Sequence, residues 1–240
     1  MNIRIFETKN EIAQYCADVF EEVIHAHSRP VLGLATGASP IETYALLVER
    51  YKSGRISFRN VTTFNLDEYC GLPTDDPNSY ISFMRRHLFD LVDISPENIH
   101  IPNGNADPEI ECARYDEEIK KAGGIDLQLL GVGRNGHIGF NEPAPYFSKG
   151  THAVQLTQST IDANAKYFQE GRCPTRALTM GIGSIFSARK IVLIATGDKK
   201  ADAVYNAVHG NISPMDCPAS VLQLHPDVTF LLDRAAAAKL

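Results

Sequence analysis

The sequence predicts a doubly wound α/β fold, in which helices flank a mostly parallel β-sheet. Short apolar runs alternate with amphipathic segments along almost all of the 240 residues, which is the pattern of successive βαβ units. Polar, glycine-containing loops follow three of these runs, and open α/β sheets bind ligands at the carboxyl ends of their strands. No repeat, low-complexity segment or Gly/Ser linker divides the chain, so we expect a single domain spanning residues 1–240.

Helix-start signals fix most of the elements in the first half of the chain. Thr8-x-x-Glu11 is a capping box, which opens a helix that runs towards His27. Ser39 offers an N-cap with Pro40 at the first helical position of a helix that ends near residue 51. Further helices are expected at 79–91 and 107–121, and apolar runs predict strands at 3–6, 31–35 and 61–65.

The second half continues the alternation. Apolar runs predict strands at 125–130, 152–156, 176–180, 191–195 and 228–232, with a helix at 199–209. The alanine run 235–238 is expected to be the end of a helix. Strands separated by helices in this way favour parallel pairing in one sheet.

Composition restricts the class of protein. The net charge of −6, with 23 Lys and Arg against 29 Asp and Glu, argues against a general nucleic-acid surface. The five cysteines are widely spaced and form no Cys-x-x-Cys pair, which favours a reducing cytoplasm over a disulfide or zinc framework. No run approaches the ~18 apolar residues of a membrane span, and the N-terminus lacks the apolar stretch of a signal peptide.

The segment from Gly131 to Pro143 is the most informative part of the chain. It follows the apolar run 125–130 and presents an amide, an imidazole and a carboxylate, those of Asn135, His137 and Glu142. Its glycines formally match the dinucleotide pattern G-x-G-x-x-G. That alternative requires a helix directly after the glycines and an acidic residue about 20 positions further on. Prolines at 143 and 145 break such a helix, and residues 143–161 contain no Asp or Glu, so an active site is the better interpretation.

Two other strand ends carry residues that suit an anion. The segment 36–40 places a glycine beside hydroxyl residues at a helix start, which is either an anion cradle or an ordinary capped turn. The pair Lys199-Lys200 stands at the start of the last long helix, where the helix dipole disfavours cations unless an anion binds. It is either an anion-binding pair or a solvated basic pair. No Gly-Lys dipeptide occurs in the chain, which disfavours a P-loop.

The adjacent carboxylates Asp67 and Glu68 follow the run 61–65. Such a pair suits a metal ion, a general base or simply a solvated loop. The rest of the chain offers no further carboxylate cluster with clear metal-ligand spacing. The general-base interpretation gains accordingly, and we expect no metal site.

Several segments resemble the glucosamine-6-phosphate deaminases of the glucosamine/galactosamine-6-phosphate isomerase family, over almost the whole chain. They are Leu32-Gly-Leu-Ala-Thr-Gly-Ala-Ser-Pro, Phe64-Asn-Leu-Asp-Glu-Tyr-Cys-Gly-Leu, Asn98-Ile-His-Ile-Pro-Asn-Gly, Gly136-His-Ile-Gly-Phe-Asn-Glu-Pro and Ala177-Leu-Thr-Met-Gly-Ile-Gly. The resemblance implies a Rossmann-like fold and the conversion of glucosamine 6-phosphate and water to fructose 6-phosphate and ammonia, in amino-sugar catabolism. No metal or organic cofactor is implied, and no partner other than this substrate.

The resemblance also implies a role for each site residue. His137, oriented by Asn135 and Glu142, would open the pyranose ring, since imidazole moves protons at neutral pH. Asp67 would carry a proton from C2 to C1 of the sugar, supported from behind by Glu68. The residues expected to hold the phosphate are Thr36, Gly37, Ala38, Ser39, Lys166 and Lys200.

Three departures from the family pattern set further expectations. Lys166 stands where arginine is common, and it keeps the charge without the bidentate fork. Asn135 stands where many relatives have Asp, so we expect the pH limb set by His137 to move upward in Asn135→Asp. His152 and Val154 stand where the allosteric members have basic residues, and the chain stops at Leu240. We therefore expect the short, non-allosteric type, without activation by N-acetylglucosamine 6-phosphate.

Two rival functions are considered. A lactonase on the same fold typically has Gly-His-x-Ala-Ser-Leu-Phe-Pro where this chain has Phe140-Asn-Glu142. A sugar-phosphate sensing module would bind glucosamine 6-phosphate without turnover, and such regulators usually carry a DNA-binding segment. Neither the oligomeric state nor the segment that closes over the site can be predicted from the sequence.

Overall fold

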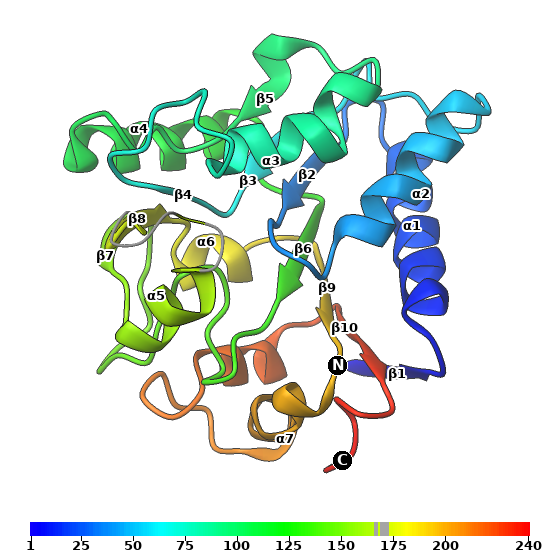
Figure 1. Cartoon of the computed structure of the whole chain (residues 1–240). Coiled ribbons are helices and arrows are strands. Elements are labelled where there is room, and N and C mark those ends of the chain that lie inside the picture. The colour runs from blue at the N-terminus through cyan, green and yellow to red at the C-terminus, as the bar shows by residue number, and fades with distance from the viewer. Residues whose placement is uncertain (166–167, 169–172) are drawn as a thin grey trace.

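The fold is built on a seven-stranded sheet in which every neighbouring pair of strands is parallel, in the order β1-β10-β9-β6-β2-β3-β5. The structure is a computed structural model that describes residues 1–165, 168 and 173–240. The strands are β1 (Asn2–Phe6), β2 (Val31–Leu34), β3 (Thr62–Asn65), β5 (Ile99–His100), β6 (Leu127–Gly131), β9 (Lys190–Ala195) and β10 (Val228–Asp233). The first and last strands pair with each other, so both ends of the chain lie at one edge of the sheet (Figure 1).

The chain order of the strands reverses between β2 and β6. From β2 the chain continues outward to β3 and β5, and from β6 it continues in the opposite direction to β9 and β10. The loops after β2 and β6 therefore flank a crevice at the carboxyl edge, which is where doubly wound sheets bind ligands. β2, β6 and β9 are buried almost throughout, which explains why their sequences are continuous apolar runs. The predicted doubly wound, mostly parallel fold is confirmed.

Helices cover the sheet. They are α1 (Lys9–Ala26), α2 (Ile41–Lys52), α3 (Tyr80–His87), α4 (Pro108–Lys121), α5 (Gln158–Ala165), α6 (Ile182–Phe186) and α7 (Ala201–His209), with short 3-10 turns η1 (Phe89–Leu91), η2 (Pro96–Asn98), η3 (Asp198–Lys200) and η4 (Pro218–Leu224). α1 and α2 lie side by side on one flank, and α5 and α6 lie on the other (Figure 1). No helix in the described part of the chain is long and apolar enough to cross a membrane.

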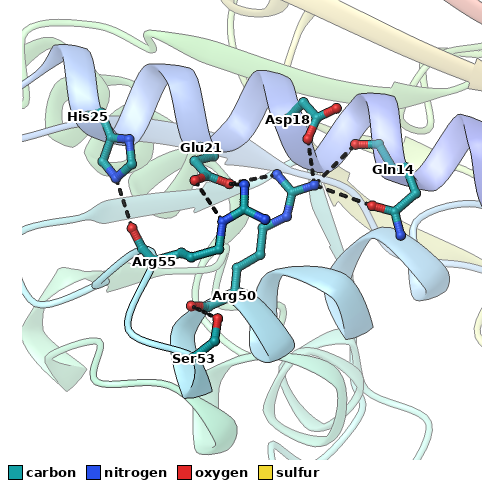
Figure 2. Close-up of polar contacts among 7 residues, drawn as sticks. All are labelled: Gln14, Asp18, Glu21, His25, Arg50, Ser53 and Arg55. Carbon is teal, nitrogen blue, oxygen red and sulfur yellow. Dashed lines mark hydrogen bonds and ion pairs between the residues drawn. The ribbon is translucent and has the colours of Figure 1, made fainter.

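A network around Arg50 joins α1 to α2. The Arg50 side chain is only 7% exposed, and its guanidinium donates to Asp18 at 2.6 Å and to Glu21 at 2.8 Å. Arg55, which is 56% exposed, also contacts Glu21. Figure 2 shows the two arginines reaching from the end of α2 and the turn after it to the same side of α1. A buried guanidinium needs such partners, because unpaired buried charge is costly.

Three expectations from the sequence need correction. The segments 152–156 and 176–180 do form strands, but β7 (His152–Gln155) and β8 (Arg176–Thr179) belong to a separate antiparallel sheet. Its third strand, β4 (Asp67–Tyr69), lies in the segment after β3 that was expected to be a polar loop. Only three residues long, β4 has no apolar alternation, and its partner β8 lies more than 100 residues further along the chain.

The helix boundaries also differ in places. The capping box at Thr8 is present as predicted, whereas Ser39 does not cap α2, whose N-cap is Pro40 without a side-chain hydrogen bond. The expected helix 79–91 is α3 followed by the separate turn η1. The alanine run 235–238 forms turns rather than a helix end.

Candidate active site

A cavity of about 700 Å³ opens at the carboxyl edge of the large sheet, at the point where the strand order reverses. Its wall comes from the loops after β2, β3, β6 and β9, together with residues of α3 and α5. The predicted site residues that line it are Thr36, Gly37, Ala38, Ser39, Asp67, Asn135, His137 and Lys200. Glu68 and Glu142 do not line the cavity, although Glu142 contacts Asn135 and His137. Lys166 lies outside the described residues.

Asp67 is a buried carboxylate that faces the cavity. It is 6% exposed and lines the cavity wall. In the described part of the chain its side chain accepts no hydrogen bond. Burial, reinforced by the nearby charge of Glu68, raises the pKa of Asp67 to about 8. An acid of this kind can hold or release a proton near neutral pH, which is the property that a general acid–base group requires.

Glu68 has a different environment, although it is the next residue. Successive side chains of a strand point to opposite faces, and the Glu68 carboxylate reaches the start of α3. It accepts hydrogen bonds from the backbone N–H groups of Tyr80 and Ile81, both at 3.0 Å, and of Tyr69 at 2.9 Å. Burial raises the pKa of Glu68, while these three donors oppose the rise. Glu68 thus fixes α3 against β4 and leaves Asp67 as the carboxylate that faces the cavity.

The loop after β6 brings His137, Glu142 and Asn135 together. His137 Nδ1 lies 3.3 Å from Glu142 Oε2, and Asn135 Nδ2 donates to the same oxygen at 2.5 Å. Asn135 Oδ1 accepts the backbone N–H of His137 at 3.3 Å. Asn135 therefore acts on the imidazole through Glu142 and the loop backbone, whereas Glu142 contacts the ring directly.

Two threonines that the sequence did not single out complete the environment of Glu142. Its Oε1 accepts hydrogen bonds from Thr160 Oγ1 at 2.5 Å and Thr157 Oγ1 at 3.2 Å. Burial alone would raise the pKa of Glu142, but the contacts to His137, Thr160 and Asn135 lower it to about 2. Glu142 is therefore a fixed negative charge that orients His137. The Thr160 hydroxyl thus connects α5 to the Glu142 carboxylate. No sequence motif around Thr160 predicts this contact.

The same loop is anchored to the small sheet. The backbone N–H of Phe140 donates to Thr179 Oγ1 at 3.0 Å, and Asn141 Nδ2 donates to the carbonyl oxygen of Met180 at 2.9 Å. Gly133 makes room for the imidazole, because a Cβ on Gly133 would lie within about 2.4 Å of the His137 ring.

Five of the expected phosphate-binding residues line the cavity, namely Thr36, Gly37, Ala38, Ser39 and Lys200. Gly37 has a φ of 98°, a conformation that favours glycine, and it carries the chain from β2 towards the start of α2. Lys200 follows β9 in η3, and its Nζ donates to the carbonyl oxygen of Val132 at 2.6 Å. Burial and the nearby charge of Arg134 lower the pKa of Lys200. The site thus combines cations and free backbone donors with an acid–base group on the same wall.

No cluster of three His, Cys, Asp or Glu side chains suited to a metal ion occurs within the described residues. The five cysteines, all of which are described, are unpaired. The chemistry that these residues can supply is proton transfer beside an anion-binding pocket.

This combination defines a doubly wound α/β enzyme with an acid–base cavity at the switch point of its sheet. Residues 6–230 match the family model described as glucosamine-6-phosphate isomerases/6-phosphogluconolactonase, and the chain belongs to this family.

Full-length relatives support the same assignment. The chain is 49% identical to the glucosamine-6-phosphate deaminase of Thermoanaerobacter pseudethanolicus, covering 99% of this chain and 94% of the relative. It is also 49% identical to the glucosamine-6-phosphate deaminase of Bacillus pumilus, with 99% of each chain covered. The solved structure of a monomeric glucosamine-6-phosphate deaminase superposes with a TM-score of 0.96 at 47% identity, over 100% of both chains. The 6-phosphogluconolactonase of Trypanosoma brucei, at 20% identity and a TM-score of 0.77 over 100% of this chain and 98% of the other, shares the fold.

Proposed function

We propose that this chain is a glucosamine-6-phosphate deaminase, which converts glucosamine 6-phosphate and water to fructose 6-phosphate and ammonia. The observation that carries the proposal is Asp67, a buried carboxylate with a pKa of about 8 that shares one cavity with His137, whose ring contacts Glu142. An aldose–ketose conversion needs two proton-transfer groups, one for the ring oxygen and one for the carbons. The full-length similarity to deaminases agrees with this assignment.

The first step that we assign is opening of the pyranose ring by His137. The imidazole takes the hydroxyl proton from O1, the C1–O5 bond breaks as the C1 carbonyl forms, and the imidazolium returns the proton to O5. Glu142 holds Nδ1 from one side, which fixes the ring and stabilises its positive charge when it is protonated.

The second step moves a proton between two carbons. In the open-chain aldehyde, ionised Asp67 takes the proton from C2 while the ammonium group gives a proton to O1, which yields an enolamine. Asp67 then returns its proton to C1, which yields a protonated imine at C2. Water then adds to C2, and the C–N bond breaks with release of ammonia. The ammonium group of the bound amino sugar places a positive charge beside Asp67, and an opposite charge favours the ionised carboxylate.

The phosphate would be bound by residues 36–39 and Lys200, which line the same cavity as Asp67 and His137. Fixing the sugar at one end places C1 and C2 near the acid–base groups, and such positioning contributes to rate as well as affinity. We further propose a cytoplasmic location, with which five unpaired cysteines agree. Lys166 remains a proposed second cation.

The test is the release of ammonia and fructose 6-phosphate from glucosamine 6-phosphate, measured in parallel for the natural sequence and Asp67→Asn. Equal amounts of the two products, lost in the variant, are expected. Hydrolysis of 6-phosphogluconolactone without deamination would instead make the chain a lactonase. Tight binding of glucosamine 6-phosphate without turnover would make it a sensing module.

A further inference from the structure

Arg134 lines the cavity, but the proposed mechanism gives it no role. It lies in the loop after β6, and β6 stands between β2 and β9 in the sheet. The loops after those two strands carry residues 36–39 and Lys200, and Arg134 lines the same cavity as both. Arg134 therefore lies in the loop between the two loops that carry the proposed phosphate-binding residues.

Among the residues that the structure describes, none is a counterion of the Arg134 side chain. It is exposed, and within the described residues it forms no ion pair and no side-chain hydrogen bond. By contrast, Arg50 and Arg189 each contact a carboxylate at 2.6 Å. The cavity wall does include the carboxylate of Asp198, but that group accepts the backbone N–H of Lys199 at 2.8 Å.

The positive charge of Arg134 is close enough to Lys200 to contribute to the lowered pKa of that amine. Two neighbouring cations repel each other, and an anion bound between them attracts both and so offsets that repulsion. The start of α2 adds free backbone N–H groups on the other side of β6. The surroundings of Arg134 are therefore complementary to a dianion.

We propose that Arg134 binds the phosphate group of the substrate, together with Lys200 and the segment 36–39. The proposal rests on the proposed function for its ligand, a phosphorylated sugar. A guanidinium offers two parallel N–H donors that match two phosphate oxygens, whereas Lys200 supplies a single ammonium group that also donates to a backbone carbonyl. Arg134 thus selects phosphorylated over neutral sugars.

The experiment compares Arg134→Ala and Arg134→Lys with Arg59→Ala. Arg59 is a matched control, because it is an exposed arginine that precedes β3 and so lies at the edge of the sheet away from the cavity. We expect Arg134→Ala to raise the KM for glucosamine 6-phosphate about 10- to 100-fold, the range for losing one charge-assisted contact, with kcat changed less than about threefold. The Ki of inorganic phosphate as a competitive inhibitor should rise by a similar factor. Both constants for Arg134→Lys should lie between those of the natural sequence and those of Arg134→Ala.

Two outcomes would overturn the proposal. One is a KM and a phosphate Ki in Arg134→Ala within about twofold of those in Arg59→Ala, which is less than one contact contributes. The other is a fall in kcat at unchanged KM, which would place Arg134 with the His137 loop rather than with the phosphate. If the natural sequence releases no ammonia, the proposed function fails. Direct calorimetric binding of inorganic phosphate to the natural sequence and to Arg134→Ala then still decides the role of Arg134.

Discussion

Replacing Asp67 with asparagine should stabilise the folded protein while abolishing turnover. The pKa of Asp67 is about 8 in the folded state, against a reference value of 3.8. Between these two values the folded protein binds more protons than the unfolded chain, so the free energy of unfolding falls as the pH rises. One proton corresponds to about 1.4 kcal/mol per pH unit. Since asparagine does not titrate, the stability advantage of Asp67→Asn should grow by about 3 kcal/mol from pH 5 to pH 7.

Urea denaturation of the natural sequence and Asp67→Asn at several pH values from 5 to 9 measures this difference. The advantage should level off above pH 8, where Asp67 is ionised in both states. Asp75→Asn removes an exposed carboxylate from the loop before α3 and controls for the change in net charge. A difference that stays constant between pH 5 and pH 8 would refute the reasoning, because Asp67 would then ionise as easily in the folded protein as in the unfolded chain.

The same property predicts the pH dependence of activity. With a pKa of about 8, Asp67 is mostly protonated in the free enzyme at pH 7, so kcat/KM should rise about tenfold per pH unit below pH 8. The substrate ammonium favours the ionised carboxylate, so the corresponding limb in kcat should lie at lower pH. Identical limbs in both parameters would argue against contact between the ammonium group and Asp67.

Four other outcomes are expected. Thr160→Val should lower kcat about 10- to 100-fold by removing a donor to Glu142, with Thr160→Ser near the natural value; equal losses in both variants would show that the hydroxyl is not responsible. Asn135→Asp should shift upward the limb of the pH–rate profile that His137 sets, because it places a second carboxylate beside Glu142; if that limb does not move, this reasoning is wrong. Arg50→Ala should lower the free energy of unfolding by about 2–4 kcal/mol in urea denaturation, and the exposed Arg55→Ala by less than about 1 kcal/mol. Initial rates should follow hyperbolic kinetics that N-acetylglucosamine 6-phosphate does not alter, and a sigmoidal curve relieved by that compound would refute this.

The strands of the large sheet could be predicted because each is a buried apolar run next to helix-start signals. The sequence could not show that β7 and β8 belong to a second sheet. Both have the apolar pattern of the other strands, and that pattern does not distinguish antiparallel from parallel pairing. β4 was missed altogether, because Asp67-Glu68-Tyr69 has no apolar alternation and its pairing with β8 is a contact between distant segments.

The candidate site divides in the same way. Asn135, His137 and Glu142 could be proposed together because they belong to one loop, in which Glu142 follows Asn135 by only seven residues. Thr160 and Arg134 could not, because their importance arises only from what the fold places beside them. Thr160 donates to Glu142 from α5. The charge of Arg134 lies near Lys200 because β6 and β9 are neighbours in the sheet.

The adjacent carboxylates at 67 and 68 show how one short strand produces two functions. The antiparallel pairing of β4 with β8 fixes the backbone, so one side chain must face the cavity and the next must face α3. Backbone N–H groups at the start of α3 donate to Glu68 and favour its ionised form. Asp67 has burial and the neighbouring charge of Glu68 instead, and both raise its pKa. A one-residue shift of β4 would exchange these environments, turning Asp67 away from the cavity and Glu68 towards it. The catalytic proposal therefore depends on the register of β4 as much as on the presence of an aspartate.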